Sequence, residues 1–184
     1  AEKYVRTKEN DYHAKAVIIA TGSEPRRLPV KEEPEFRGRG IHYCATCDGP
    51  FYRDADLVVV GGGTSAFEEA VFLTRYARKV TILIRSDSPR AARYYVDDAV
   101  RNPRIEIIRN TVIKKVIGED SVKSIVVENT RTGEVYGMKA DGIFVYIGSE
   151  PNTKYFRECL NLSDRGYIIT DQNMATNIPG VFAA

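Results

Sequence analysis

Apolar residues in the middle of the chain follow the pattern of alternating strands and helices. Residues 57–60 and 80–84 are short β-branched runs, which is typical of buried strands. Between them, residues 65–78 carry apolar side chains at three- and four-residue steps, which predicts an amphipathic helix. The alternation continues with a helix over residues 90–101 and a strand over residues 105–108. Short strand–helix–strand connections predict a right-handed parallel α/β sheet.

The pattern changes after the third of these strands. Residues 111–118, 122–129 and 134–139 are strand-like, and Thr132-Gly133 predicts a hairpin turn. They predict an antiparallel meander laid on the parallel unit. Residues 143–148 return to an apolar run, which we expect to be another buried strand. The predicted fold is α/β, a Rossmann-like parallel sheet with an antiparallel β-meander.

The first part of the chain indicates a domain boundary. Residues 16–22 form a β-branched run that ends in glycine, which predicts a buried strand and a turn. Residues 23–40 are rich in proline, glycine and charge, so we expect a surface connection between two domains. Gly-Ser-Glu-Pro occurs at residues 22–25 and again at 148–151, each time after an apolar strand. This echo suggests two related units, of which the first is only partly present.

Composition narrows the class of protein. The chain of 184 residues has 27 basic and 25 acidic side chains, a net charge of +2, which gives no reason to expect nucleic acid or an anionic membrane as a partner. With 43% hydrophobic and 28% charged residues, the chain has a globular composition. No apolar stretch approaches the roughly 18 residues of a membrane span, and the N-terminus lacks the apolar core of a signal peptide. We therefore expect a cytoplasmic protein.

The glycine-rich turn after the first middle strand indicates a nucleotide site. Gly61-x-Gly63-x-x-Ala66 fits the dinucleotide-binding fingerprint and lies between a strand and a helix start. The first glycine permits a tight turn, the second lets a pyrophosphate approach the backbone, and the small third residue lets helix and strand pack closely. We expect the pyrophosphate to meet the N–H groups at the start of the helix.

The end of the next strand bears on which nucleotide binds. An NAD site usually places an acidic residue about 20 residues after the glycines, on the ribose 2′-hydroxyl. Here Arg85 and Arg90 follow the strand, and guanidinium groups bind a 2′-phosphate as a planar fork. Asp87 argues against a 2′-phosphate site, because an acidic residue favours a ribose hydroxyl. The alternative is that these charged residues form a solvated loop without a ligand. The pattern favours NADPH and leaves NADH possible.

Cys44 and Cys47 lie within disulfide reach in a C-x-x-C motif. Such a pair is a redox dithiol, a structural disulfide or half of a metal site. Zinc needs four ligands and no second C-x-x-C exists, so even with His42 the cluster is strained, and we expect no metal. A redox dithiol is favoured. Asp48 could then move a proton during thiol exchange, its alternative being a cap or turn residue.

A hydride donor beside a dithiol needs a mediator. Nicotinamide gives two electrons as a hydride, whereas disulfides are reduced by thiolate exchange. Flavin is the cofactor that joins these two chemistries. The sequence therefore predicts FAD as well as NADPH as cofactors.

Four segments together resemble the thioredoxin reductase family, specifically its low-molecular-weight, FAD-dependent type. They are Ala-Thr-Gly at residues 20–22, Cys-Ala-Thr-Cys-Asp-Gly at 44–49, the glycine turn and helix at 61–70, and residues 178–184. The resemblance covers essentially the whole chain. It implies an enzyme that passes electrons from NADPH through FAD and the Cys44/Cys47 disulfide to a thioredoxin-like small dithiol protein, and a homodimer.

The resemblance also implies a role for individual residues. Cys47 would face the flavin, Cys44 would attack the partner's disulfide, and Asp48 would be the acid that protonates during exchange. Beyond the glycine turn, the residues expected to contact the nicotinamide nucleotide are Thr64, Ser65, Glu68, Arg85 and Arg90.

The resemblance further implies a domain plan. Residues 1–26 would end a first FAD-domain segment, residues 27–152 would form the NADPH-binding domain with the redox C-x-x-C, and residues 153–184 would begin a returning FAD-domain segment. The N-terminal G-x-G-x-x-G turn of the family's FAD domain is not in this sequence. We therefore expect a fragment centred on the NADPH domain, inactive as a reductase without the rest of the intact parent.

One departure from the family pattern keeps other functions open. The family's His-Arg-Arg-x-x-x-Arg run reads Ile84-Arg85-Ser86 and then Arg90 here. One alternative is a disulfide reductase of the same family that uses NADH, ferredoxin or another donor. A second alternative, favoured by the missing part of the FAD domain rather than by this run, is a non-catalytic nucleotide-binding module.

Overall fold

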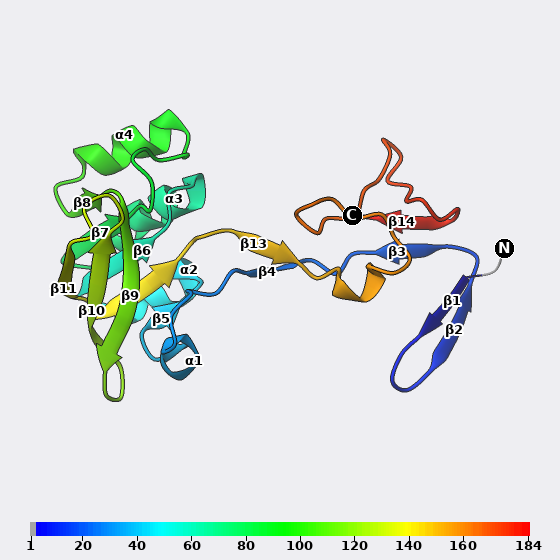
Figure 1. Cartoon of the computed structure of the whole chain (residues 1–184), viewed down its shortest axis with the longest axis horizontal. Coiled ribbons are helices and arrows are strands. Elements are labelled where there is room, and N and C mark those ends of the chain that lie inside the picture. Colours follow the sequence, from blue (N-terminus) through cyan, green and yellow to red (C-terminus); the bar gives the residue numbers. More distant parts are fainter. Residues whose placement is uncertain (1–2) are drawn as a thin grey trace. The chain divides into compact units, whose positions relative to one another are not determined.

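The structure is a computed structural model that describes residues 3–184 and divides into two compact units (Figure 1). The larger unit is Pro25–Gly148, and the smaller unit comprises the described residues of Ala1–Glu24 together with Ser149–Ala184. The division therefore falls after residues 24 and 148, where the sequence placed it after residues 26 and 152.

A five-stranded parallel sheet forms the centre of the larger unit. Its strands lie in the order β5-β12-β6-β7-β8, and every neighbouring pair is parallel. The strands are β5 (Ile41–His42), β6 (Asp56–Val60), β7 (Lys79–Leu83), β8 (Ile105–Ile108) and β12 (Gly142–Val145). The predicted parallel sheet is confirmed, and the apolar run near residue 143 is one of its central strands.

Helices α3 (Thr64–Leu73) and α4 (Arg93–Arg101) cover one face of this sheet (Figure 1). The first helix ends earlier than its apolar pattern predicts. The hydroxyl of Thr74 donates to the carbonyl of Val71 at 2.7 Å, and a threonine that bonds back in this way competes with helix continuation. The second helix begins later than expected, because the amides of Arg90 and Ala91 donate to the carbonyl of Gly62 instead.

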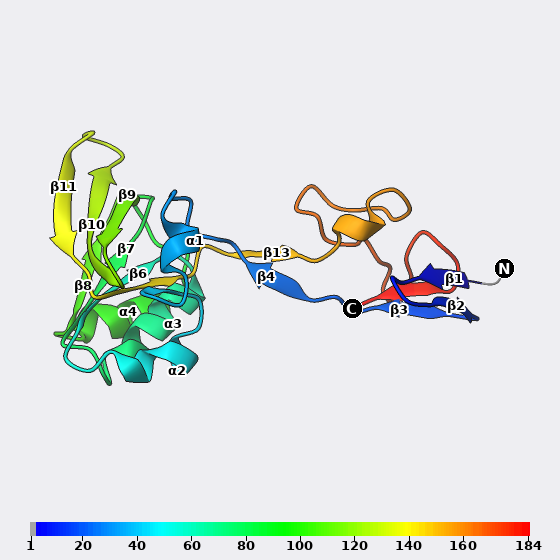
Figure 2. The same cartoon turned by 90° about the horizontal axis from the view of Figure 1, so that it is seen from below.

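The predicted meander covers the opposite face of the sheet (Figure 2). Strands β9 (Thr111–Gly118), β10 (Val122–Asn129) and β11 (Val135–Lys139) pair antiparallel in the order β11-β10-β9. Gly133 takes a φ of +74° in the turn between the last two strands, as the hairpin prediction requires.

The parallel sheet is buried on both faces, which explains its unbroken apolar runs. In β6, Leu57 and Val59 pack toward the helices while Val58 packs toward the meander. In β12, Phe144 packs toward the helices and Ile143 toward the meander. The larger unit therefore has three layers, with one apolar core on each side of the parallel sheet.

Residues 23–40 are more than the surface connection that their composition predicts. They contain β4 (Ser23–Pro25) and the short helix α1 (Glu33–Phe36). Leu28 and Phe36 are 4% and 2% exposed and belong to the core between the two sheets. The prediction was wrong here because a few well-spaced apolar side chains suffice to fix a Pro- and Gly-rich segment. Beyond it lie α2 (Ala45–Asp48) and the 3₁₀ turn η1 (Gly49–Phe51).

The two copies of Gly-Ser-Glu-Pro are neighbours in the fold. Strand β4 pairs with β13 (Ser149–Pro151) in a two-stranded sheet. Each strand follows a glycine with positive φ, Gly22 at +65° and Gly148 at +105°. These two strands are where the chain leaves the smaller unit for the larger one and returns.

The smaller unit has a modest core. It contains the hairpin β1 (Lys3–Arg6) and β2 (Asp11–Ala14), the parallel pair β3 (Val17–Ile19) and β14 (Val181–Ala183), and the 3₁₀ turn η2 (Lys154–Phe156). Its buried apolar residues are Ile19, Leu160, Val181 and Ala183. No helix in residues 3–184 has the length and apolar character needed to cross a bilayer.

Candidate active site

The glycine turn after β6 has a geometry that needs glycine at residue 61. Gly61 has a φ of +151°, and a Cβ there would collide with the carbonyl oxygen of Tyr146. Gly63 is different, since a Cβ there would have no neighbour within 4 Å. Ala66 is fully buried beneath the turn. The turn therefore leaves open space beside Gly63, as a phosphate group approaching the backbone requires.

Helix α3 begins at this open space without a side-chain cap. Its first N–H groups and the positive end of its dipole suit an anion. Ser65 and Glu68 are exposed on its first turns. Thr64 also has a structural contact, since its hydroxyl accepts a hydrogen bond from the amide of Ala92 at 3.3 Å, just before α4.

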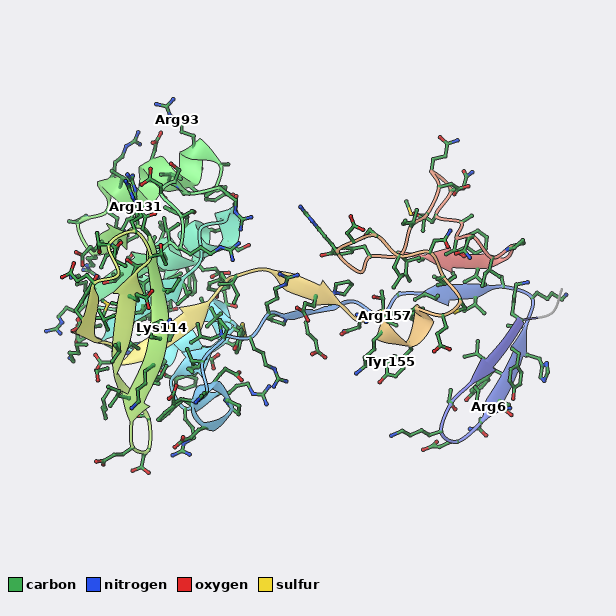
Figure 3. All side chains as sticks on the ribbon, in the orientation of Figure 1. Arg6, Arg93, Lys114, Arg131, Tyr155 and Arg157 are labelled. Atoms are coloured by element: carbon green, nitrogen blue, oxygen red, sulfur yellow. A yellow bond between two sulfur atoms is a disulfide. The ribbon has the colours of Figure 1, made fainter. Side chains whose placement is uncertain are left out.

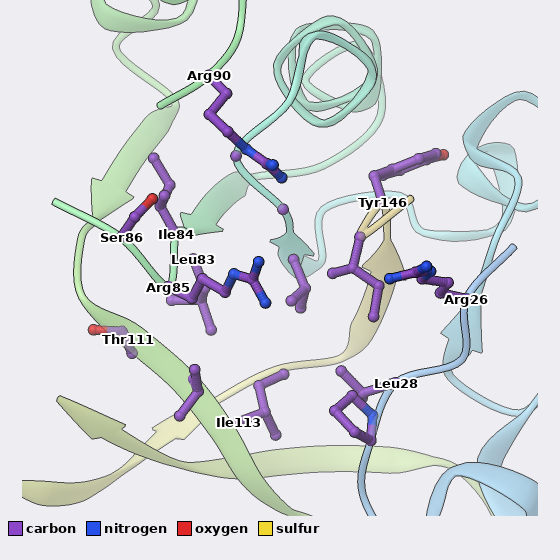
Figure 4. A pocket seen from close by; sticks show the side chains of 16 residues that line it. Arg26, Leu28, Leu83, Ile84, Arg85, Ser86, Arg90, Thr111, Ile113 and Tyr146 are labelled. Atoms are coloured by element: carbon purple, nitrogen blue, oxygen red, sulfur yellow. The ribbon is translucent and has the colours of Figure 1, made fainter. Parts of the chain in front are cut away.

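A pocket of about 240 Å³ opens at the carboxyl ends of β6, β7 and β12 (Figure 4). It brings together Gly61, Arg85 and Arg90, three of the residues that the sequence singled out. Gly63, Thr64, Ser65, Ala66 and Glu68 are not part of its lining and lie along the adjacent start of α3. Ligands of parallel α/β sheets bind at this end of the strands.

Arginine side chains dominate the charge of the pocket. Arg26, Arg85 and Arg90 direct their guanidinium groups toward the same space (Figure 4). Arg26 was not found by sequence reasoning, because it lies in the segment expected to be a surface connection. Three guanidinium groups around one cavity favour a ligand with phosphate groups.

Asp87 takes no part in this pocket lining. Its carboxylate accepts hydrogen bonds from Asn110 and from Arg131, both at 3.2 Å, with Arg131 labelled in Figure 3. The hydrogen bond from Asn110 and the charge of Arg131 hold the pKa of Asp87 below its usual value. The carboxylate that could have met a ribose hydroxyl is thus engaged by side chains outside the lining of the pocket.

Cys44 and Cys47 form a disulfide, with their Cα atoms 5.3 Å apart. Cys44 precedes α2, and its sulfur accepts a hydrogen bond from the amide of Cys47 at 3.3 Å and lies 3.4 Å from the hydroxyl of Thr46. Such contacts stabilise negative charge on a sulfur when the bond is reduced. Within the larger unit, Cys47 is exposed and Cys44 is half-buried.

Asp48 ends α2 and pairs with a buried histidine. One carboxylate oxygen lies 3.1 Å from Nδ1 of His42, and Nε2 of that ring lies 2.6 Å from the phenol oxygen of Tyr52. Burial lowers the pKa of His42, although the nearby charge of Asp48 opposes this shift. In residues 3–184 no three or more histidine, cysteine or acidic side chains are grouped so that they could hold a metal ion.

Tyr146 connects the C-x-x-C segment with the pocket. It lines the pocket, and its phenol oxygen accepts a hydrogen bond from the amide of Ala45, the first residue of α2, at 2.8 Å. Burial raises the pKa of this phenol, so it stays neutral. A polar ring at the end of an otherwise apolar strand was the one signal in the sequence that could have indicated this role.

Known proteins resemble the chain over its whole length. The family described as pyridine nucleotide-disulphide oxidoreductase matches residues 1–184. A 34.2 kDa protein in the rubredoxin operon of Clostridium pasteurianum is 49% identical over 183 residues, which are 100% of this chain and 59% of that protein. A thioredoxin reductase of Peptoclostridium acidaminophilum is 44% identical over 99% of this chain and 60% of its own length.

A solved structure agrees with these sequence relatives. The crystal structure of Lactococcus lactis thioredoxin reductase matches with a TM-score of 0.94 and 40% identity, and the match covers 100% of this chain and 61% of that one. The chain thus spans about three fifths of the length of the proteins it matches. From its glycine turn, its C-x-x-C disulfide and these matches over the whole of this chain, we conclude that the chain belongs to the pyridine nucleotide-disulphide oxidoreductase family.

Proposed function

We propose that the chain supplies the NADPH-binding and disulfide-bearing parts of a thioredoxin-reductase-type flavoprotein. In this proposal, electrons pass from NADPH through FAD and the Cys44–Cys47 disulfide to the disulfide of a thioredoxin-like protein. The observation that carries it is that one compact unit, Pro25–Gly148, contains both an arginine-lined nucleotide pocket and a C-x-x-C disulfide. Tyr146 lines the pocket and accepts a hydrogen bond from the amide of Ala45, between the two cysteines.

NADPH is the nucleotide that the pocket supports best. Arg85 and Arg90 line it and could bind a 2′-phosphate, while Asp87, which would favour a free ribose hydroxyl, is held by Arg131 and Asn110. The open space beside Gly63 would take the pyrophosphate, with Thr64, Ser65 and Glu68 along the start of the helix.

The chemistry of the dithiol follows from the contacts of its sulfurs. Bound flavin supplies the conversion of a hydride into the electron pair that opens the disulfide. Cys44 then attacks the partner's disulfide as a thiolate, because its sulfur has the amide and hydroxyl contacts that stabilise charge. Cys47, the sulfur assigned to the flavin, closes the disulfide again, and Asp48 protonates the leaving thiolate.

The partner and the setting belong to the same proposal. The relatives named thioredoxin reductase support a thioredoxin-like small dithiol protein as the electron acceptor. A homodimer and a cytoplasmic location are proposed for the whole protein on the same likeness.

One observation favours an alternative electron donor. Ile84 is buried, and the hydroxyl of Ser86 is engaged with the carbonyl of Ser88 at 2.9 Å. These are the positions where the family carries His and Arg, so two groups that would bind phosphate are replaced. A reductase that uses NADH, ferredoxin or another donor, or a nucleotide-binding module without turnover, is therefore the second candidate.

The dithiol step can be tested on the chain itself. The chain is reduced with dithiothreitol, freed of reductant without oxygen, and mixed with an equal amount of oxidised thioredoxin. We expect stoichiometric reduction of thioredoxin, with Cys44→Ser abolishing it and Cys47→Ser trapping a mixed disulfide through Cys44. Reduction that survives Cys44→Ser, or its absence in the wild type, would contradict the proposal.

A further inference from the structure

His42, considered in the sequence only as a metal ligand, lies at the centre of a hydrogen-bonded chain of three side chains. Its Nδ1 lies 3.1 Å from the carboxylate of Asp48, and its Nε2 lies 2.6 Å from the phenol oxygen of Tyr52. The ring is 7% exposed and stacks on Phe144 with ring centroids 5.2 Å apart. Both nitrogens of a buried imidazole are therefore occupied, two residues before Cys44.

The protonation of the ring determines which groups donate. Burial lowers the pKa of His42 below 6.5, so the imidazole is neutral at pH 7 and has one donor and one acceptor. Because a carboxylate only accepts, Nδ1 carries the hydrogen and donates to Asp48. Nε2 then accepts from Tyr52, whose pKa is raised to about 12 by burial, so that its phenol keeps its hydrogen.

The same chain of contacts also suits a protonated Asp48. Its O–H would donate to Nδ1, and the other imidazole tautomer would donate from Nε2 to the oxygen of Tyr52. Neither hydrogen bond is lost when the carboxyl group gains or loses its proton. The carboxyl group therefore stays in one place through a cycle of proton transfer, which an unpartnered and partly exposed aspartate would not do.

We propose that His42 is a positioning residue that holds the carboxyl group of Asp48, the residue after Cys47, in one place in both of its protonation states. This rests on the proposed function, in which Asp48 exchanges protons with the dithiol. Without His42 the acid would still be present, but its carboxyl group would spend much of its time in other rotamers.

The exchange balances with one proton on Asp48. The Cys44 thiolate attacks a disulfide, forms a mixed disulfide and expels one thiolate, which takes the proton of Asp48. The Cys47 thiol then gives its proton to Asp48 and attacks the sulfur of Cys44, and the second thiolate that leaves takes that proton. Two electrons pass from the dithiol, which becomes a disulfide, to the partner disulfide, which becomes two thiols.

Two further ionisable groups face this chain of contacts. Asp141 acts on Tyr52 by its charge, and Tyr146 feels the charge of Asp48. Both are kept unchanged in the variants below, so that a displaced pH profile reports on His42 and its two partners.

The test measures thiol exchange without nucleotide or flavin. The reduced chain is mixed with oxidised glutathione between about pH 5.5 and 8.5, a range that brackets the titration of histidine, and disulfide formation is followed by alkylating the remaining thiols. His42→Phe preserves ring volume and stacking, His42→Asn preserves an amide donor toward Asp48, and Asp48→Asn is the reference. Circular dichroism and the melting temperature check the fold of each variant.

We expect His42→Phe to lower the rate constant of disulfide formation about tenfold at neutral pH. This is a part of the 10²–10⁴-fold that a general acid typically contributes. The dependence of the rate constant on pH should be displaced as well. His42→Asn should recover most of the rate. In an Asp48→Asn background, His42→Phe should cause no further loss, because the two residues act as one unit. The role of His42 would be overturned if His42→Phe left the rate constant and its pH dependence unchanged. It would also be overturned if His42→Phe caused the same loss in the Asp48→Asn background as in the wild type.

If His42→Phe does not fold, Tyr52→Phe replaces it in the same double-mutant cycle. The loss should then be about threefold, since one of the two hydrogen bonds of the ring remains, and it should again vanish in the Asp48→Asn background. An unchanged rate in a folded Tyr52→Phe variant would overturn the proposal. A wild-type dithiol that exchanges with no disulfide would instead overturn the proposed function itself, and the role of His42 with it.

Discussion

At the scale of single residues, the site depends on a few contacts that the local sequence explains only in part. The fingerprint Gly61-x-Gly63-x-x-Ala66 predicts a tight turn, and the structure shows that its two glycines have different surroundings. Gly61 lies against backbone, whereas Gly63 lies beside open space. Substitution at each should therefore have a different consequence.

Gly61→Ala should destabilise the fold, while Gly63→Ala should weaken nucleotide binding alone. The new methyl at residue 61 would meet the carbonyl oxygen of Tyr146 with φ at +151°, and strain of this kind costs on the order of 1–3 kcal/mol. Gly63 has a φ of −93° that alanine adopts readily. Urea unfolding and NADPH titration of both variants provide the measurement, and equal loss of stability in the two would contradict this account.

His42 should make the chain sensitive to mild acid. Burial lowers the pKa of His42 in the folded state from 6.5, so just below pH 6.5 the unfolded chain binds a proton that the folded chain does not bind. Proton binding therefore favours the unfolded state. Stability should therefore fall as the pH drops from about 7 toward 5, through the range in which histidine titrates. His42→Phe should flatten this part of the profile of stability against pH. A steep profile that survives His42→Phe would contradict the assignment.

At the scale of elements, the strands were predictable and the contacts between elements were not. Residues 57–60 and 143–148 are apolar on both faces because layers cover the sheet on both sides, and this produces a clear signal in sequence. Asp87 is the opposite case, since its engagement by Asn110 and Arg131 depends on loops that only the fold brings together. Side-chain contacts between residues far apart in the chain produce no periodic pattern in the sequence, so they could not be predicted from it.

The link between β12 and α2 should be measurable as stability. Tyr146→Phe removes the acceptor of the Ala45 amide, and a buried donor left without a partner costs about 1–3 kcal/mol. We expect a lower midpoint of urea unfolding with an unchanged slope. Tyr94→Phe on the exposed part of α4 is the matched control and should leave the midpoint where it is. Equal midpoints in the two variants would show that this hydrogen bond contributes nothing.

At the scale of the whole molecule, the two units differ in how much apolar surface they bury. The larger unit has two extensive cores, while the smaller unit has Ile19, Leu160, Val181 and Ala183. The repeated Gly-Ser-Glu-Pro, each copy of which follows an apolar strand, suggested two units, and the division between the units falls at these repeats, after residues 24 and 148. The contribution of residues 26–36 to the larger core could not be predicted, since their prolines and charged side chains outnumber the apolar side chains that anchor the segment.

Hydrogen exchange should separate the two units. Amides of β6 and β12, which are buried between two layers, should be the slowest to exchange in the chain. Amides of β3 and β14 should exchange at least tenfold faster, because opening a small core costs less free energy. Timed labelling of the intact chain, followed by mass spectrometry of its peptides, gives the exchange rates of both pairs of strands. Equal protection of the two pairs would mean that the two units unfold together.

The most direct measurement is calorimetric titration of the chain with NADPH and with NADH. We expect NADPH to bind at least tenfold more tightly, a difference of about 1.4 kcal/mol, because Arg85 and Arg90 line the pocket and would meet the 2′-phosphate. Arg85→Gln with Arg90→Gln should remove the preference while leaving the fold intact. Equal affinity for the two nucleotides, or no binding of either by the folded chain, would contradict the assignment of Pro25–Gly148 as an NADPH-binding unit.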